Sequence, residues 1–311
     1  MDANYNIVLY CCTFSRDLLR TVRLVQSIEK YNVEKIPFYI SVPDNEVYLF
    51  REKLKNYAVL IFSEKEILQA NSKLDLKKLY EVPGSIRQQV IKSEFWRLKK
   101  SENYLVLDAD CIFIRHFKQS DFIVKDDIPY SVIHEGKDLL QSTNIFGPKK
   151  TREYFLADRE PIKSALKRQG ITYDFGYAPF LWSGKVWKSF DDNYLSPRNL
   201  NFLDAIIKCG SEFTWYGESL LAYQAIPIFP REQLFRHYHY ENQLWTDRAI
   251  GFTNTKLSKD YLGVVYQSNW QIWKHFGSTK KSIFSLVWRF ILRFIFIIIF
   301  KIKVIINLFF N

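Results

Sequence analysis

Residues 104–113 read Tyr104-Leu105-Val106-Leu107-Asp108-Ala109-Asp110-Cys111-Ile112-Phe113, an apolar run that two carboxylates interrupt. The first four residues predict an apolar β-strand, and the two acids come directly after it. In open α/β sheets, ligands bind beyond the carboxyl ends of the strands. Two acids in so apolar a frame therefore indicate a ligand site at the end of a buried strand.

The residues before this strand alternate short β-rich runs with helical stretches, which predicts an α/β fold with a mainly parallel sheet. Strands are expected at residues 7–12, 37–42 and 58–62, then at 130–134 and 180–183. Helices are expected after the break at 13–17, with Ser15 or Asp17 as N-cap, from 83 onward, near 150–169 and near 200–208.

Asp108 and Asp110 are hard oxygen ligands, of the kind that Mg²⁺ or Mn²⁺ uses when it bridges phosphate oxygens. Such a cation would offset the charge that develops on a leaving diphosphate. The alternative is a solvated strand end with a turn-forming Asp. On the preceding helix, Gln88 and Lys92 are four residues apart and share a face, with Gln89 close by. These groups suit phosphate, ribose or base contacts, and the alternative is a solvated helix face.

The segments PGSIRQQVIKSEFW (83–96) and YLVLDADCIFIRHF (104–117) resemble an uncharacterised bacterial glycosyltransferase-like family of GT-A fold. Its members carry an R-Q-Q-x-x-K helix before an L-D-x-D strand, and the likeness extends over about residues 7–118. The resemblance implies a Rossmann-like nucleotide-sugar-binding domain with metal ligands at Asp108 and Asp110. The donor contacts that it implies come from Thr13, Ser15, Arg16, Asp17, Arg87, Gln88, Lys92 and Asp108.

An inverting transferase needs a carboxylate within reach of the acceptor hydroxyl, whereas a retaining one does not need it there. Glu218 is the first candidate, because 215–223 resembles, more weakly, an acceptor-facing segment of the same family; the spelling GESLLAY departs from the family pattern. Asp174 is the second candidate. The alternative for each is an ordinary capping or paired acid.

His237 and His239 are spaced to lie on one face of a strand, and GT-A enzymes often complete the metal site with a late His or Asp. A structural role is the alternative for this pair. The chain is 17% aromatic, and one or two of four tryptophans are expected to stack on sugar at an acceptor cleft. These are Trp182, Trp215, Trp245 and Trp270.

The C-terminal segment 279–311 holds six basic residues and no acid, more than half of the net charge of +11. Its charge-free run of 294–300 is too short for an ordinary spanning helix, which needs about 20 predominantly apolar residues. On a helical wheel most of its cations fall in one narrow stripe, which predicts an interfacial helix on an anionic membrane. A buried core helix and a tilted spanning helix with snorkelling cations are the alternatives.

Four cysteines without CxxC spacing favour a reducing compartment, and MDANYNIVLY has no signal-peptide pattern. The expected location is therefore the cytoplasmic face of the inner (plasma) membrane, with the protein bound peripherally or monotopically. The expected organisation is a GT-A-like domain over 1–278 and a membrane-binding helix over 279–311.

The expected function is metal-dependent transfer from a nucleotide sugar to a cell-surface glycan or lipid-linked acceptor. One rival is a nucleotidyltransferase of Rossmann-like fold, which usually has a Gly-rich loop that CCTFSRD (11–17) lacks. The other is a non-catalytic peripheral membrane or glycan-binding protein. A nucleic-acid partner is not expected, because the charge excess is concentrated in the apolar tail.

Overall fold

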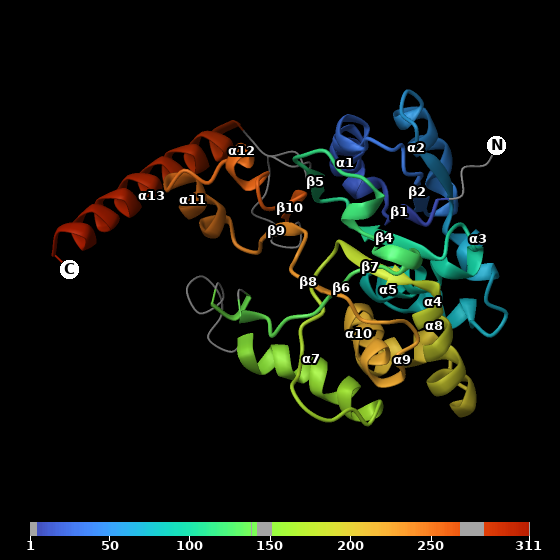
Figure 1. Ribbon diagram of the computed structural model, residues 1–311. Coiled ribbons are helices and arrows are strands. Elements are labelled where there is room, and N and C mark those ends of the chain that lie inside the picture. The colour runs from blue at the N-terminus through green and yellow to red at the C-terminus, as the bar shows by residue number, and fades with distance from the viewer. Residues whose placement is uncertain (1–4, 138, 142–150, 268–282, 311) are drawn as a thin grey trace.

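The computed structural model describes residues 5–137, 139–141, 151–267 and 283–310. A five-stranded sheet in the order β3-β2-β1-β4-β7 forms the centre of the molecule (Figure 1). Its first four members are parallel, and β7 pairs antiparallel with β4. The strands are β1 Ile7–Cys12, β2 Phe38–Val42, β3 Leu60–Ser63, β4 Asn103–Leu107 and β7 Phe180–Ser183. The predicted α/β fold with a mainly parallel sheet is confirmed.

Successive residues of a strand point to opposite faces of a sheet. Both faces of this sheet are buried, each in its own apolar cluster. In β1, Tyr10 belongs to one apolar cluster and Leu9 to the other. In β4, Val106 and Leu107 divide in the same way. Helices cover each side, as expected for a parallel sheet.

On the side of Leu9 the sheet is covered by α1 Leu18–Tyr31 and α2 Val47–Leu54. On the side of Tyr10 the covering helices are α3 Glu64–Gln69, α4 Leu76–Glu81, α5 Gly84–Glu94, α8 Gly184–Phe190, α9 Phe202–Lys208 and α10 Glu212–Tyr223. The predicted helices that begin after residue 17 and at 83–85, and those near 150–169 and 200–208, are all present. The third of these is α7 Thr151–Ala165.

A second sheet of three strands, in the order β5-β10-β9, begins directly after Asp110. Its strands are β5 Cys111–Phe113, β9 Phe235–Tyr238 and β10 Gly263–Tyr266. The strand β10 runs antiparallel to β5 and parallel to β9. The two acids predicted as metal ligands therefore lie where the chain passes from one sheet to the other. A small pair, β6 Ser131–Val132 and β8 Pro230–Arg231, replaces the longer strand predicted at 130–134.

Short helical turns connect these elements. The 3₁₀ helices are η1 Ser15–Asp17, η2 Asp44–Glu46, η3 Phe95–Leu98, η4 Gln119–Asp121, η5 Lys125–Asp127 and η7 Ser196–Arg198, and η6 Asp191–Leu195 is a π-helix.

The C-terminal part contains α11 Glu241–Ala249, α12 Asn254–Leu257 and the long helix α13 Ile283–Phe310. In Figure 1, α13 lies beside α11 and α12 and extends away from the rest of the protein. Within the ranges that the structure describes, no helix is both long and apolar enough to cross a membrane. The domain boundary predicted near residue 278 falls in 268–282, outside the described residues.

Gly263 in β10 tests how closely the second sheet is packed. A Cβ atom there would lie 2.0 Å from the ring of Phe235 and 2.6 Å from the carbonyl oxygen of Ile112. We expect Gly263→Ala to lower the free energy of unfolding by about 1–3 kcal/mol, because this contact cannot be relieved without moving backbone. Urea denaturation measures the change.

The matched control is Gly84→Ala at the start of α5, where a Cβ would meet no heavy atom within 4 Å. This variant should be unchanged or more stable by up to about 1 kcal/mol, since alanine restricts the unfolded chain. Equal losses in the two variants would contradict the packing described for the second sheet.

Candidate functional site

A cavity of about 590 Å³ lies at the carboxyl ends of the four parallel strands. The residue that follows each strand, or the turn that it starts, contributes to the wall: Thr13 after β1, Pro43 after β2, Glu64 after β3 and Asp108 after β4. Its volume is within the range of small-molecule sites, and its position is the usual ligand site of an open α/β sheet. The complete lining is Cys12, Thr13, Phe14, Arg16, Asp17, Pro43, Glu46, Glu64, Gly84, Ser85, Arg87, Gln88, Ile91, Asp108, Ala109, Asp110 and Gln267.

The structure brings most of the predicted donor and metal residues to this one cavity. Both aspartates of the Asp-Ala-Asp segment are present in the wall. Two of the predicted donor residues, Ser15 and Lys92, are not part of the lining. The predicted residues in the wall are Thr13, Arg16, Asp17, Arg87, Gln88, Asp108 and Asp110.

Backbone hydrogen bonds hold the two aspartates in a tight turn between β4 and β5. The amide of Cys111 donates to the carbonyl oxygen of Asp108 at 3.1 Å. The amide of Tyr266, at the end of β10, donates to the carbonyl oxygen of Asp110 at 3.1 Å. Asp110 is buried, whereas the side chain of Asp108 is 37% exposed. Both donors belong to the second sheet, which therefore holds the turn that follows β4.

Lys92 supports Asp108 from behind the cavity. Its Nζ lies 2.6 Å from Asp108 Oδ1 and 3.6 Å from Glu212 Oε1 on α10, and only 5% of its side chain is exposed. Burial lowers the pKa of Lys92, but the charges of Asp108 and Glu212 outweigh it, and the pKa is raised above its ordinary value. Burial raises the pKa of Glu212, an effect that Lys92 partly offsets. Lys92 therefore does not lie on a solvated helix face, because α9 and α10 cover this side of α5.

Hydrogen bonds join the region of Cys12 to Ser15 to the start of α5 and to η2. Gln88 Nε2 donates to the carbonyl oxygen of Cys12 at 3.0 Å. The amide and hydroxyl of Ser15 both donate to the carboxylate of Glu46, each at 2.6 Å. Ser15 does not line the cavity itself, but it holds the carboxylate of Glu46, which does. The predicted N-cap role of Asp17 is realised in backbone position, but its side chain pairs with Arg20 and caps no amide.

Three acidic or amide residues of the wall were missed from the sequence: Glu46, Glu64 and Gln267. A signal was available for Glu64, because it comes two residues after the strand predicted at 58–62 and parallel strands end at a common edge. Its pKa is raised by burial, while Arg87, 4.0 Å away, acts in the opposite direction.

The charges of the cavity wall are unbalanced. Five carboxylates and two guanidinium groups line it. A diphosphate would be repelled by so many acids unless a cation lay between them. Among the described residues, no group of three or more His, Cys, Asp or Glu side chains is placed to hold a metal ion. Mg²⁺-type sites usually use only one or two carboxylates and complete their shell with water and substrate phosphates. Asp108 and Asp110 fit such a site.

The two candidate bases do not reach this cavity. Glu218 is fully buried on α10 and forms a bidentate ion pair with Arg168, with Arg168 Nη2 2.8 Å from Oε1. Asp174 is fully buried and bound to Arg159 at 2.8 Å. Both carboxylates therefore occupy internal ion pairs, and the assignment of either as the base at the cavity is corrected. A carboxylate already paired and shielded from solvent is not available to an incoming hydroxyl.

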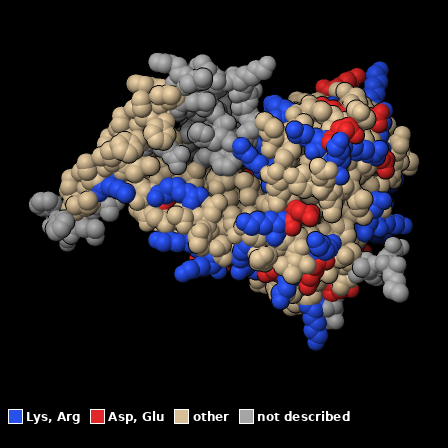
Figure 2. Space-filling model, turned by 90° about the horizontal axis from the view of Figure 1, so that it is seen from above, with Lys and Arg blue, Asp and Glu red and all other residues tan. Residues whose placement is uncertain are grey.

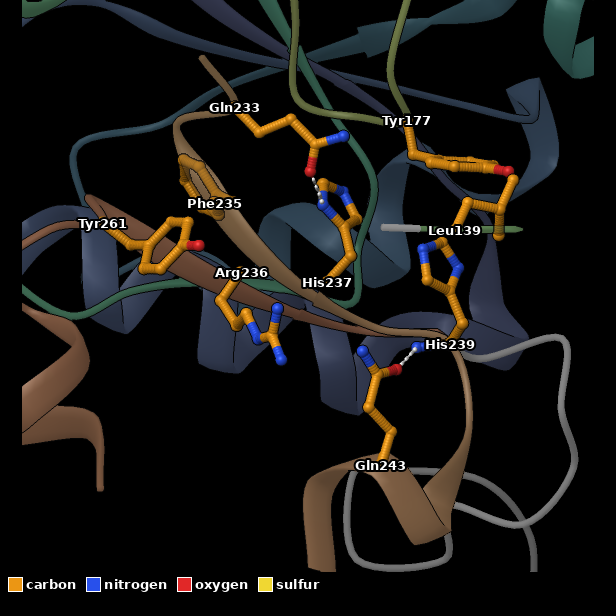
Figure 3. A pocket seen from close by; sticks show the side chains of 9 residues that line it. All are labelled: Leu139, Tyr177, Gln233, Phe235, Arg236, His237, His239, Gln243 and Tyr261. Atoms are coloured by element: carbon orange, nitrogen blue, oxygen red, sulfur yellow. Dashed lines mark hydrogen bonds between the residues drawn. The ribbon is translucent and has the colours of Figure 1, made fainter. Parts of the chain in front are cut away.

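His237 and His239 line a different, much smaller pocket (Figure 3). Their rings are stacked with centroids 5.7 Å apart, and His237 hydrogen-bonds the carbonyl oxygen of Ala178 at 2.9 Å and Gln233 at 3.2 Å. Burial, followed by the neighbouring His237 and Arg236 charges, lowers the pKa of His239 to about 3. Neither imidazole borders the cavity that contains Asp108 and Asp110. Their position does not support the predicted metal role.

The described tryptophans that were expected to stack on sugar lie in apolar clusters and not at the large cavity. Trp182 and Trp215 are buried in the main core, in a network of stacked and edge-on rings. Trp245 is buried on α11 against Phe296 of α13, with ring centroids 5.7 Å apart. Trp270 lies outside the described residues. The three described rings are absent from the wall of the large cavity.

Comparison with known proteins adds a family to this geometry. The model of a family described as of unknown function (DUF6492) matches residues 4–292. No curated protein matches the chain. Among solved structures, the apo form of mouse xyloside xylosyltransferase 1 is similar to this chain, with 9% sequence identity and a TM-score of 0.45. The match covers 85% of this chain and 98% of the mouse chain.

The ion pairs of Lys92 predict a coupled effect on stability. Lys92→Met leaves Glu212 buried without its cation, and we expect it to lower the free energy of unfolding by about 3 kcal/mol. Adding Glu212→Gln removes the stranded charge and should recover a large part of that loss. Chemical denaturation of the single and double variants measures the coupling. Losses that simply add would contradict it.

The neutral, buried His239 predicts a dependence of stability on pH. Between pH 6.5 and about 3 the unfolded state binds more protons at this residue than the folded state does, so stability falls as the pH is lowered through this window. From pH 7 to pH 5, we expect this residue to contribute a loss of about 2 kcal/mol. The measurement is the free energy of unfolding of the native chain and of His239→Gln at both pH values. If the two proteins lose equal stability, His239 is not the responsible group.

Proposed function

The chain belongs to the family of unknown function DUF6492, and we propose that it is a glycosyltransferase that uses a divalent cation and a nucleotide-sugar donor. The observation that carries this proposal is the meeting of Asp108, Asp110, Arg16 and Arg87 around one cavity at the ends of the parallel strands. Carboxylates for a metal ion and guanidinium groups for phosphate are the two components that a metal-bound diphosphate requires.

In this proposal Asp108 and Asp110 hold Mn²⁺ or Mg²⁺, which would offset the negative charge on the departing nucleoside diphosphate. Lys92 keeps the Asp108 carboxylate oriented through the contact of 2.6 Å. Arg16 and Arg87 bind phosphate oxygens, since their guanidinium groups are permanently charged and suited to such oxygens. Thr13, Glu46 and Gln88 lie in the same wall, where hydroxyl, carboxylate and amide groups can bind ribose or base.

Neither Glu218 nor Asp174 is proposed as the base, because each forms a buried ion pair with an arginine. Three other carboxylates, Asp17, Glu46 and Glu64, line the cavity. The proposed acceptor is a cell-surface glycan or a lipid-linked saccharide.

The loop after β1 argues against nucleotidyl transfer. Residues 11–17 contain no glycine, so the loop lacks the close backbone approach by which Gly-rich loops bind phosphates. An assay of pyrophosphate release from nucleoside triphosphates and sugar phosphates tests that rival directly. Robust release would replace glycosyl transfer as the activity.

Asp110→Asn tests the metal and donor assignment. We expect the native protein to be stabilised by one of the nucleoside diphosphates or by CMP, and only with Mn²⁺ present, because a ligand that binds the folded state alone raises its stability. The variant should fold normally and lose at least about tenfold in Mn²⁺-dependent affinity, since a metal-held ligand loses one of its two carboxylates. Thermal shift followed by titration calorimetry measures both.

The control is Asp44→Asn, an exposed carboxylate that pairs with Lys65 and does not line the cavity. It should bind like the native chain. Donor hydrolysis or transfer should follow the same order among the three proteins. Equal affinity of Asp110→Asn and the native chain would end the metal assignment.

A further inference from the structure

The helix α13 presents a broad apolar surface to solvent. Twelve large apolar side chains on it are each more than 40% exposed, and together they form what we call the apolar face of α13. It consists of Val287, Trp288, Phe290, Ile291, Leu292, Phe294, Ile295, Ile298, Ile299, Ile302, Ile305 and Ile306. Figure 2 shows mostly uncharged surface along this helix, whereas acids and bases are interspersed over the rest of that view. A continuous apolar surface of this kind marks an interaction site.

The opposite side of α13 is the one that contacts the protein. Phe296 packs on the cluster that contains Trp245, and its ring lies 6.3 Å from that of Phe300. At 100° per residue, the apolar face covers an arc of about 200°, and position 296 lies outside it. The helix is therefore docked on α11 by its narrower side, and the wide apolar side points outward.

The charges of α13 select the partner. The helix contains Arg289, Arg293, Lys301 and Lys303 and no acid, and Lys280 and Lys281 come shortly before it. On the wheel, positions 289, 293 and 303 lie outside the apolar face. The exposed Lys301 lies near one edge of that face, from which a long side chain can reach a lipid headgroup. An excess of cations beside a wide apolar face favours an anionic lipid surface.

We propose that the apolar face of α13 inserts into one leaflet of an anionic phospholipid membrane, with the helix axis in the membrane plane. A second copy of the chain is a poorer occupant, because helix pairs bury a narrow seam and would leave most of a 200° arc in water. Insertion along the whole helix covers the arc at once.

The first experiment measures binding of the full-length protein to vesicles of phosphatidylcholine alone or mixed with phosphatidylglycerol, by flotation. We expect binding that is stronger on the anionic vesicles and weakened by salt. Ile298→Glu combined with Ile302→Glu places two acids in the apolar face and should reduce binding by at least about tenfold. The control pair, Tyr48→Glu with Leu49→Glu, adds the same charges at exposed apolar positions of α2 and should bind like the native chain.

The second experiment measures depth. Trp288 belongs to the apolar face and is 55% exposed, so phospholipids brominated on their acyl chains should quench its fluorescence on binding. The quenched component should disappear in Trp288→Phe, which keeps the apolar surface and should still bind. Neither readout depends on a nucleotide or on turnover, so the membrane proposal stands or falls separately from the glycosyltransferase proposal.

Three results would overturn the proposal. One is native binding by the Ile298→Glu and Ile302→Glu variant. Another is a stable dimer, seen by light scattering without lipid, that the same two substitutions dissociate and that does not bind vesicles. The third is resistance of the protein in native membranes to extraction by alkaline carbonate regardless of lipid charge, which indicates a spanning helix.

Discussion

The buried contact between Lys92 and Asp108 is the interaction on which the arrangement of the large cavity depends. It joins α5 to the end of β4, and through Glu212 it reaches the start of α10. A lysine removed from water is tolerated only when carboxylates compensate its charge, and here two of them do so. One of these carboxylates is 37% exposed and faces the cavity, so the same contact that stabilises the core also orients a site residue.

The position of the cavity follows from the parallel sheet. Because β1 to β4 run in one direction, the turns that follow them meet at one edge of the sheet. The first residue after each strand lies there: Thr13, Pro43, Glu64 and Asp108. The second sheet then holds Asp110 from the other side through the amide of Tyr266. An acid-rich wall at such an edge is costly for an anionic ligand alone and suitable for one that arrives with a metal ion.

The two proposals concern different parts of the molecule. Together they would bring the donor and a lipid-linked acceptor to the same membrane surface. The cavity would bind a water-soluble donor, whereas α13 would hold the protein on a lipid surface, where a lipid-linked acceptor is concentrated. Membrane binding would depend on the outward side of α13 alone, because Phe296 occupies the side that is in contact with α11.

The sequence by itself determined the parallel sheet, the Asp-Ala-Asp segment at its edge and the loop of Thr13 to Asp17, because apolar periodicity and strand ends are local patterns that the backbone must satisfy. It also predicted a helix within 279–311, which the structure shows as α13 Ile283–Phe310. Only the tertiary structure decided which polar residues are already paired. Arg168 and Glu218 are 50 residues apart, and Lys92 and Asp108 are 16 apart, so no local pattern could reveal these ion pairs. Nor could spacing place His237 and His239, whose separation from the cavity depends on where β9 docks beside β10.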